Sequence, residues 1–504
     1  MTRVAIIGGG PAGLMTAYFI ERRRGPGWRA TLIEASDRLG GKMHTRRFDA
    51  APVKYEAGVA ECYDYEAIGP DPLRQLVREL GLKTVTTGSR AVVLNSRLLR
   101  DESDLRTHYG DSTLAAVQDF RRRASAALPI TDWHRGFTED DNRHRWARCT
   151  AADLLDEVAD PVARKYLKVD AHSDMATEPH LASGLVGLRN VLKSVPGYGA
   201  QYWIDGGMEM LPRRLADSLT RTDVQLDTSV VALSRTHQGR YTVRSRRGRT
   251  IVDREFDAVI LALPYHQLAA IDMTGERLRR AMAAHVARYD SPGHYLRVSV
   301  LFDRPFWRAL FDGSWVMLDA FGGCCVYDES GRHDAHAHGV LGWLLAGADA
   351  LALCNADDRT IASRVLESLP DALYAEGRAR VVEVKVHRWA GALSGQPGGW
   401  RIRNPRVAHQ PEPVDHRGVV VAGDYLFDST LNGVLRSASI AVDLLGEAAM
   451  AGRTQDRLHV WSGRASHRHS SVSPPARSHL NRRRRRLPGV PRCAAARPDR
   501  ADTG

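Results

Sequence analysis

Long apolar runs are absent from this chain of 504 residues. A helix that crosses a bilayer needs about 20 consecutive apolar residues, so we expect no membrane span. Residues 4–20 follow Arg3 without a charge, as in a secretion signal, but four glycines and a proline interrupt them. Because a signal peptide needs a continuous apolar stretch, we expect the protein to stay in the cytoplasm.

Cysteine is also scarce. Six cysteines are scattered through the chain, and no two of them form a CxxC pair. This spacing excludes a disulfide framework and gives no sign of a metal site. It fits a reducing compartment.

The net charge is small over most of the chain and concentrated at the C-terminal end. From Arg453 to the C-terminus there are thirteen Arg and three Asp, a net charge of +10 out of +12, which leaves +2 for the first 452 residues. Residues 453–504 have too few apolar side chains to build a core, so we predict a disordered basic tail. An arm that binds an anionic surface is the alternative. The nearly neutral body needs no nucleic acid for activity.

What the chain does have is the composition of a globular protein, 43% hydrophobic and 26% charged. Its length predicts two or more domains. Buried parallel strands are typically continuous apolar runs. Such runs occur at residues 4–7, 258–263 and 418–422, strand-like segments at 30–33 and 224–233, and helical patterns at 14–23 and 431–445. Runs so far apart predict one sheet assembled from distant segments, in an α/β fold.

A glycine-rich turn follows the first of these strands. Gly8, Gly10 and Gly13 satisfy G-x-G-x-x-G, with Pro11 and Ala12 between the last two glycines. Gly8 permits the tight turn, Gly10 lets the backbone approach a pyrophosphate, and Gly13 allows the helix to pack closely on the strand. The N-terminus of that helix attracts phosphate. The pattern predicts a dinucleotide site.

Glu34 completes this pattern. It stands twenty-one residues beyond Gly13, at the end of the second strand. A carboxylate there accepts hydrogen bonds from a ribose 2′-hydroxyl. These residues do not distinguish NAD from FAD.

The residues that follow do distinguish them. Residues 34–42 read Glu-Ala-Ser-Asp-Arg-Leu-Gly-Gly-Lys, which resembles the E-A-x-x-R-x-G-G-R signature of the flavin amine oxidase superfamily. That superfamily includes monoamine, polyamine and L-amino-acid oxidases and is related to phytoene desaturases. The resemblance implies FAD, with Arg38, Gly40, Gly41 and Lys42 beside its pyrophosphate. Lys42 replaces the family's arginine, which keeps the charge but loses the guanidinium fork.

The resemblance continues through most of the first 450 residues, at 55–60, 205–212, 259–264, 422–424 and 432–434. It implies further contacts with FAD along the whole cofactor. They are Gly58, Val59 and Ala60 along the flavin ring, Val230 at the adenine, Ala262 at the end of the following strand, Gly423 and Asp424 at the ribityl chain and pyrophosphate, and Gly433 and Val434 at a helix N-terminus near the flavin C2 carbonyl.

The family's fold is implied as well. It is a Rossmann-like FAD-binding domain that is discontinuous in sequence, with an inserted α+β substrate domain on a mixed sheet. In this chain the FAD-binding domain would comprise residues 1–65, 200–265 and 386–450. The substrate domain would comprise residues 66–199 and 266–385.

Arg297 is the first departure from the family pattern. Many amine oxidases carry a lysine ten residues before the tryptophan of a P-F-W motif, here Trp307, and that lysine holds a water at flavin N5. Arg297 occupies this place. Arginine cannot deprotonate, but it can hold a water or a substrate carboxylate. The alternative is a solvated charge on a strand.

The second and third departures concern the aromatic cage of the amine oxidases. Trp389 corresponds to the family's aromatic beside the flavin. Gly398 stands where some members have a cysteine bonded to the flavin, so we expect non-covalent FAD, and Trp400 is the nearest aromatic that could replace the next one. The second cage aromatic is replaced by Thr430. Because a cage suits an amine through its ring faces, its loss disfavours a simple alkyl amine.

The resemblance implies a flavin enzyme that takes a hydride from a carbon next to an amine. An amino acid, an amino sugar or a related small amine would be oxidised to an imine, and oxygen would reoxidise the flavin. A C–C or C–N desaturase on the same scaffold is the main alternative, and an anionic-surface or nucleic-acid binder acting through the arginine tail is another. His172 is either a general base or, more simply, a hydrogen-bonded structural residue.

Overall fold

The computed structural model describes residues 1–465 apart from 89, 136, 196, 197, 199, 312, 333–336 and 428, with side chains up to residue 450 except those of residues 90 and 133–135. The chain divides into two units, Met1–Met450 and Ala451–Gly504. Every element discussed below, except the end of the last helix, belongs to the first unit.

A parallel sheet of five strands is assembled from distant parts of the chain, as the sequence predicts. Its order is β10-β2-β1-β14-β21. The strands are β1 (Thr2–Ile7), β2 (Trp28–Ile33), β10 (Asp223–Gln225), β14 (Ala258–Leu261) and β21 (Val419–Val421). All four pairings are parallel. The strands β1, β2, β14 and β21 contribute residues to two cores. Helices α1 (Pro11–Arg23), α8 (Met210–Asp217) and α15 (Leu431–Ala465) share one of them.

The run at residues 224–233 corrects one prediction. It is not a single strand but two strands in different sheets, β10 and β11 (Ser229–Arg235). Asp227 lies between them with φ 53°, a left-handed conformation that a continuous strand cannot contain. The second piece joins a four-stranded sheet of order β13-β12-β11-β15, with β12 (Tyr241–Arg247), β13 (Thr250–Phe256) and β15 (Asp272–Met273).

The glycine turn lies at the carboxyl end of β1. Gly8 has φ 107°, which favours glycine strongly. Helix α1 begins at Pro11, three residues before the predicted start, because proline suits the first helical position. A Cβ added to Gly13 would lie 1.9 Å from the Gly8 carbonyl oxygen. Helix and turn therefore pack too closely for any other residue.

A second large sheet is mixed and has seven strands, in the order β20-β16-β19-β18-β17-β7-β8. Its strands are β7 (Arg90–Leu94), β8 (Arg97–Leu99), β16 (Pro292–Phe302), β17 (Trp315–Leu318), β18 (Cys324–Asp328), β19 (Gly339–Ala346) and β20 (Val381–Ser394). Only the β17–β7 pair among them is parallel. The predicted boundary between residues 385 and 386 falls inside β20, so this strand belongs to both predicted segments.

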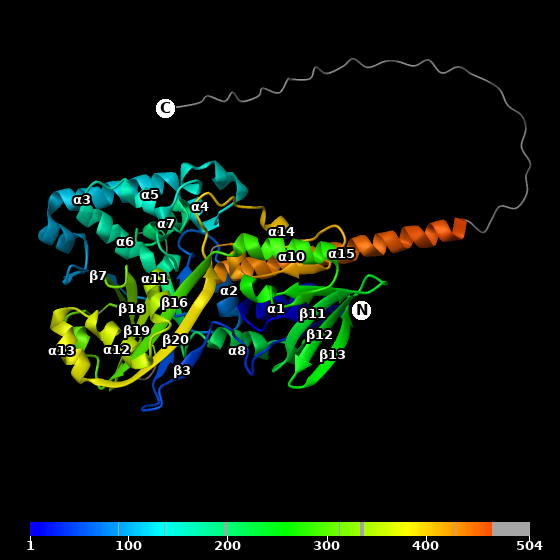
Figure 1. The fold of residues 1–504 in the computed structure, drawn as a ribbon, viewed down its shortest axis with the longest axis horizontal. Helices are drawn as coiled ribbons and strands as arrows, with labels where there is room; N and C mark the ends of the chain where they lie inside the picture. The colour runs from blue at the N-terminus through cyan, green and yellow to red at the C-terminus, as the bar shows by residue number, and fades with distance from the viewer. Residues whose placement is uncertain are drawn as a thin grey trace, which may run out of the picture. The chain divides into compact units, whose positions relative to one another are not determined.

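Helices cover this sheet at one end of the unit (Figure 1). They are α3 (Glu102–Ala127), α5 (Ala151–Asp156), α6 (Pro161–Met175) and α7 (Gly184–Leu192), and they share one apolar core with residues of β7 and β18. The predicted α/β class, with a Rossmann-like parallel sheet and a second, mixed sheet, is confirmed.

The last helix departs from the sequence-based expectation. We predicted a helix over residues 431–445, and α15 runs from Leu431 to Ala465. Residues 453–465, predicted to be disordered, are therefore helical, since no proline stops the helix before Pro474. The rest of the predicted tail, residues 466–504, lies outside the described part of the chain.

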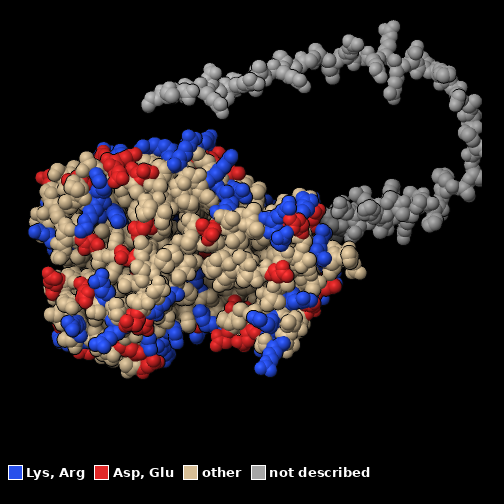
Figure 2. All heavy atoms as spheres, in the orientation of Figure 1, with Lys and Arg blue, Asp and Glu red and all other residues tan. Residues whose placement is uncertain are grey.

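The surface of the first unit agrees with its small net charge. On the face shown in Figure 2, Lys and Arg alternate with Asp and Glu and form no large patch of one sign. Among the described residues, no helix is both long and apolar enough to cross a membrane. Within the same residues, no cluster of His, Cys, Asp or Glu is arranged to hold a metal ion.

Candidate active site

One cavity, about 450 Å³ in volume, brings together residues from both sheets. Most of the residues predicted to bind FAD line it. They are Gly8, Gly10, Pro11, Ala12, Glu34, Arg38, Gly41, Lys42, Gly58, Val59, Ala60, Ala262, Gly423, Asp424 and Val434. The three predicted catalytic residues, Arg297, Trp389 and Thr430, line the same cavity.

Four predicted cofactor residues do not line it. Gly13 packs on Gly8, as described above, and Gly40 uses its N–H to bond the Gly9 carbonyl at 2.9 Å. Val230 lies on β11, partly buried against the core beneath that sheet. The Gly433 N–H donates to the Thr430 hydroxyl at 3.1 Å. These four residues would affect a ligand only indirectly, by fixing the conformation of the backbone around the cavity.

Glu34 is fixed by backbone donors at the end of β2. Its Oε2 accepts from the Gly9 N–H at 2.6 Å, and its Oε1 accepts from the Ser36 N–H at 2.9 Å and the Ser36 hydroxyl at 2.7 Å. The carboxylate is thereby turned toward the glycine turn. Oε2 accepts only one of these bonds, so it has a second lone pair for a ribose hydroxyl.

Lys42 and Asp424 meet across the cavity wall. The Lys42 ammonium lies 3.1 Å from Asp424 Oδ2 and donates to the Ala392 carbonyl at 2.6 Å. Arg38 folds back on its own loop and donates to the Gly41 carbonyl at 2.6 Å. Sequence reasoning missed the Lys42–Asp424 pair, because nothing in two segments so far apart shows that they touch.

Residues 56–60 form a strip of backbone that side chains hold from three sides. Arg297 Nε donates to the Glu56 carbonyl at 3.0 Å, and Trp389 Nε1 donates to the Ala57 carbonyl at 2.7 Å. Arg332 donates to the Ala60 carbonyl. A Cβ at Gly58 would lie 1.9 Å from the Lys42 carbonyl oxygen, which excludes any larger residue there. The strip is thus held by hydrogen bonds from three side chains and is closely packed at Gly58.

Arg297 is buried, with no exposed surface, so the interpretation as a solvated charge is wrong. Its guanidinium forms an ion pair with Glu329, which is also buried. Gly342 on the neighbouring strand leaves room for this pair, since a Cβ there would lie 2.9 Å from both partners. One guanidinium nitrogen, Nη1, has no hydrogen-bond partner among the described residues.

A second buried carboxylate belongs to the same cluster. Glu56 accepts from the Met208 N–H and from the Thr45 hydroxyl, both at 2.9 Å, and its own N–H donates to Glu329 at 3.0 Å. Burial, followed by the nearby Glu329 charge, raises the pKa of Glu56 to about 7. Both oxygens of Glu56 are satisfied by the protein itself.

Thr430 has a local role that explains its identity. It precedes α15, bonds the Gly433 N–H through its hydroxyl and accepts from the Val434 N–H through its carbonyl at 3.0 Å. Threonine is a good residue for such a helix N-cap. The signal was present in the sequence, a hydroxyl residue directly before an apolar helix, but the comparison with an aromatic cage obscured it.

Three tyrosines and two acids that sequence reasoning missed complete the cavity. The part lined by Glu61, Tyr63, Tyr295 and Tyr327 is called the tyrosine end below, and Asp174 borders it too. Tyr295 pairs with Trp389 across β16 and β20 and stands two residues from Arg297, so all three side chains share one face of the sheet. This alternation along residues 295–297 was the available signal.

Trp400 and Gly398, the positions compared with an aromatic and a cysteine of the family, both lie outside the lining of the cavity. Trp400 does not line the cavity; it packs on Tyr289, with ring centroids 5.3 Å apart, so it does not replace the cage aromatic. Gly398 lies against the Cys149 carbonyl rather than in the cavity. Cys62 borders the cavity, but burial raises the pKa of its thiol to about 12, which leaves it a poor nucleophile.

His172 has the structural role that the sequence suggested as the simpler reading. It is fully buried, and its two ring nitrogens bond the Gly323 carbonyl at 2.8 Å and Glu178 Oε1 at 3.2 Å. It does not line the cavity.

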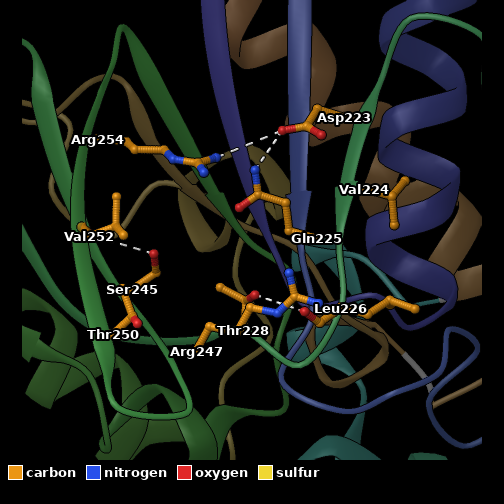
Figure 3. Close-up of a pocket in the computed structure, with 10 residues that line it drawn as sticks. All are labelled: Asp223, Val224, Gln225, Leu226, Thr228, Ser245, Arg247, Thr250, Val252 and Arg254. Atoms are coloured by element: carbon orange, nitrogen blue, oxygen red, sulfur yellow. Dashed lines mark hydrogen bonds and ion pairs between the residues drawn. The ribbon is translucent and has the colours of Figure 1, made fainter.

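A second hollow, about 610 Å³, lies between β10 and the β12–β13 hairpin (Figure 3). It shares no lining residue with the first cavity. Its polar groups bond to one another: Asp223 lies 3.8 Å from Arg254 and accepts from Gln225, and the Thr228 hydroxyl donates to the Leu226 carbonyl at 2.8 Å. Most of its other side chains are exposed. Nothing in it points to chemistry.

The residues of the first cavity fit FAD. Gly10 faces open space, since a Cβ there would have no neighbour closer than 4.0 Å, and the first N–H groups of α1 lie beside it. Glu34 supplies acceptors and Lys42 a cation at the same wall. A dinucleotide needs this donor and acceptor set.

Known proteins share both the sequence pattern and the fold. The chain is 23% identical over 341 residues to the flavin-dependent L-tryptophan oxidase RebO of Lentzea aerocolonigenes, covering 61% of this chain and 67% of that one. Among solved structures, putrescine oxidase bound to putrescine superimposes with a TM-score of 0.67 at 20% identity, over 88% of this chain and 99% of that chain. Cyclohexylamine oxidase from Brevibacterium oxydans IH-35A gives 0.69 at 17% identity, over 89% and 99%.

The family model described as flavin containing amine oxidoreductase matches residues 11–445. That match begins at Pro11, inside the glycine turn, and ends within α15; it covers the strands of both sheets apart from β1. The chain therefore belongs to the flavin-containing amine oxidoreductases and is an FAD-dependent enzyme.

Proposed function

We propose that the enzyme oxidises a small molecule at a carbon next to an amine nitrogen, giving an imine that hydrolyses, and that oxygen then reoxidises the cofactor. FAD, when bound, supplies the redox chemistry by taking a hydride at N5. The substrate is an amino acid, an amino sugar or a related small amine. The protein's share is to bind, orient and deprotonate it.

The tyrosine end of the cavity carries this proposal. It combines aromatic faces with ionisable groups: Tyr295 and Trp389 from neighbouring strands, with Glu61, Asp174 and Arg297 lining the same cavity. Aromatic faces attract an ammonium group, and carboxylates bind it by hydrogen bonds. The relatives named above act on L-tryptophan, putrescine and cyclohexylamine according to their names, which agrees with an amine as the reacting group.

The same end disfavours a desaturase. A substrate without polar groups would leave the buried ionisable side chains unpaired, which costs about 1–3 kcal/mol for each stranded group. A desaturase would be expected to have a long apolar tunnel instead. Buried polar groups at the reacting end therefore favour a substrate that carries charge.

Arg297 is proposed to bind a substrate carboxylate. Glu329 neutralises its charge, so it would stabilise a negative flavin only weakly, whereas Nη1 remains a directional donor. This favours an amino acid within the proposed substrate class.

We propose non-covalent binding of FAD through the predicted cofactor residues. The glycine turn and α1 would meet the pyrophosphate, Glu34 the ribose, and the strip at 56–60 the flavin ring. The thiol nearest to this strip, Cys62, is held protonated by burial. Acid precipitation of the yellow protein should therefore release all its flavin, and flavin that stays on the pellet would contradict the claim.

The substrate class can be tested directly. The holoenzyme is mixed anaerobically with L-tryptophan, other amino acids, putrescine, cyclohexylamine and glucosamine, and bleaching of the oxidised flavin band is followed. We expect at least one of these amines to bleach it and oxygen to restore it. Bleaching by apolar polyenes or porphyrinogens with none by amines would overturn the proposal in favour of a desaturase.

A further inference from the structure

Glu56, which is buried, and Glu61, which is half-buried with a buried Oε2, differ in a way that stability does not explain. Glu56 has both oxygens bonded by protein donors at 2.9 Å. Glu61, five residues later, has only a long contact, 3.4 Å, from the Tyr327 hydroxyl to Oε1, and its buried Oε2 has no partner within the described chain. A buried carboxyl with an unsatisfied oxygen is costly. Glu61 is therefore placed for something other than the fold.

Glu61 borders the cavity where a substrate would meet the flavin. It follows Ala60 directly, at the end of the strip, and lines the cavity with Tyr63 and Tyr295. The side chain is half-buried, because part of it faces the cavity. Tyr327 connects it to Arg297, whose guanidinium lies 4.7 Å from the centre of the Tyr327 ring. Tyr327 thus contacts both the Glu61 carboxyl and the Arg297 guanidinium.

We propose that Glu61 is the base that removes a proton from the substrate ammonium group before hydride transfer. The proposal rests on the function proposed above. Nothing in the chain's resemblance to its family assigns a role to this residue, which the sequence comparison passed over.

The step balances as follows. An ammonium N–H bond breaks and a carboxyl O–H bond forms on Glu61, which leaves a neutral amine with a lone pair. The adjacent carbon then loses a hydride, with two electrons, to FAD, and the lone pair forms the C=N bond. The products are an iminium ion, reduced flavin and protonated Glu61. Glu61 releases this proton to water after the product leaves and before the next substrate binds.

The surroundings of Glu61 suit a base that works near neutral pH. Burial raises its pKa to about 7, Asp174 adds to this, and Arg332, Lys193 and Arg297 act in the opposite direction. Lys193 also pairs with Asp174 at 3.1 Å. An efficient general base has a pKa near the working pH.

The first test needs no substrate. The visible spectrum of the bound oxidised flavin is followed in holoenzyme from pH 5 to 9, for the wild type, Glu61→Gln and Glu56→Gln. We expect a spectral change with a midpoint near pH 7 in the wild type and in Glu56→Gln, and none in Glu61→Gln. A titration that persists in Glu61→Gln, or disappears only in Glu56→Gln, overturns the assignment.

Two further variants should move the midpoint in opposite directions. Asp174→Asn removes a like charge and should lower the pH of the midpoint, because the carboxylate form of Glu61 is then less disfavoured. Tyr327→Phe removes a donor to that form and should raise it. Folding of each variant is checked by its FAD content. Identical midpoints in both would show that the titrating group is elsewhere.

The second test is kinetic and uses the amine from the panel that bleaches the flavin fastest. Anaerobic stopped-flow should give a reduction rate that rises through about pH 7 in the wild type. At pH 8, Glu61→Gln should be slower by 100-fold or more, since general bases contribute about 10²–10⁴, and its profile should lose this step. If amines reduce the wild type and Glu61→Gln keeps the rate and the profile, the base is wrong while the proposed function stands. If no amine reduces the wild type, both fail.

Discussion

The two ends of the cavity are built by different means. At the glycine-turn end, residues 8–13 with Glu34, backbone geometry makes the site: Gly8 has a left-handed φ, and Gly13 packs against the Gly8 carbonyl. At the tyrosine end, side chains make it, with Arg297 and Arg332 holding the strip at 56–60 and buried carboxyls nearby. The stability of the first end should be most sensitive to a Cβ added where backbone meets backbone, as at Gly13. The second should tolerate modest changes of shape and no unpaired charge.

The largest effect is expected from a methyl group at the first end. Gly13→Ala places a Cβ 1.9 Å from the Gly8 oxygen, a contact that forces α1 off β1. Alanine would ordinarily stabilise a helix by about 1 kcal/mol. Here we expect a loss of more than about 4 kcal/mol, in the range of severe core changes. Urea unfolding of the apoprotein measures it.

Gly10→Ala is the matched control. Its Cβ meets nothing nearer than 4.0 Å, so the apoprotein should fold normally and only FAD binding should weaken. If both variants lose stability equally, the distinction between packing and ligand approach at this turn is wrong.

Breaking the buried ion pair should have the next largest effect. Arg297→Met leaves Glu329 buried without its partner and frees the Glu56 carbonyl, and removing one member of a buried pair costs about 3–5 kcal/mol. Arg297→Lys should restore only part of this, because one ammonium cannot reproduce the planar fork. The free energy of unfolding of the holoenzyme is measured in urea.

The double variant Arg297→Met with Glu329→Gln separates charge from packing. It should recover a large part of the lost stability, since no ion is then stranded. Stopped-flow kinetics of both half-reactions test the functional role of Arg297. The rate of flavin reduction by an amino acid should fall more than the rate of reoxidation by oxygen. Equal, wild-type rates in both would place Arg297 outside the chemistry.

The two carboxyl groups with raised pKa values, Glu56 and Glu61, lie at or near the tyrosine end. This end should therefore contribute to the pH dependence of the free energy of unfolding. Glu56 has a folded-state pKa of about 7, against 4.5 when exposed. The folded protein therefore holds a proton that the unfolded chain releases, so stability is full below about pH 4.5 and is lost as the pH rises through 7. The loss is up to about 3 kcal/mol for this group.

Urea unfolding at pH 5 and pH 8 tests this. Burial lowers the pKa of His285 to about 3 and that of His409 to about 4, and these groups stabilise the fold as the pH rises over the same range, so the test is the comparison with a variant. Relative to the wild type, Glu56→Gln should be more stable at pH 8 than at pH 5. The same pH dependence in the wild type and in Glu56→Gln would mean that the Glu56 carboxyl is ionised at both pH values.

A side-chain change at the glycine-turn end should have a smaller effect. Glu34→Ala removes the acceptor proposed for the ribose and also strands the Gly9 N–H, which now donates to it at 2.6 Å. FAD affinity should weaken by about 1–3 kcal/mol, the usual cost of lost buried hydrogen bonds. Fluorescence titration of the apoprotein with FAD measures it. Unchanged affinity would place the ribose elsewhere.

The difference between the ends also explains what the sequence could predict. The glycine-turn end is local: residues 4–34 contain strand, turn, helix, strand and Glu34 in order, and their spacing alone indicates the site. The tyrosine end is assembled from β5 (Cys62–Asp64), α6, β16 and β18. No local pattern shows that Glu61 and Tyr327 meet, and the burial that raises the pKa of Glu61 exists only in the fold.

The errors have similar causes. The strand at 224–233 was predicted from apolar content, and Asp227, which breaks it, has no strong sequence signal. Thr430 was interpreted by its place in a family pattern, whereas its immediate neighbours make it a helix cap. Arg297 was allowed to be a solvated charge, since the sequence does not show Glu329 opposite it.

The smallest effect is expected from removing the C-terminal segment, which contributes to neither end. Every residue that lines the cavity lies at or before Val434, and the first 452 residues carry a net charge of only +2. Truncation after Gly452 should therefore leave the FAD content, the visible spectrum and the turnover of an amine substrate within about twofold of the full chain, since surface changes away from a site usually alter stability by less than about 0.5 kcal/mol. Salt-dependent retention on an anionic matrix should fall, because most of the positive charge is gone. Loss of flavin or of solubility on truncation would show that the segment contributes to the folded body, and would extend the comparison to a third region.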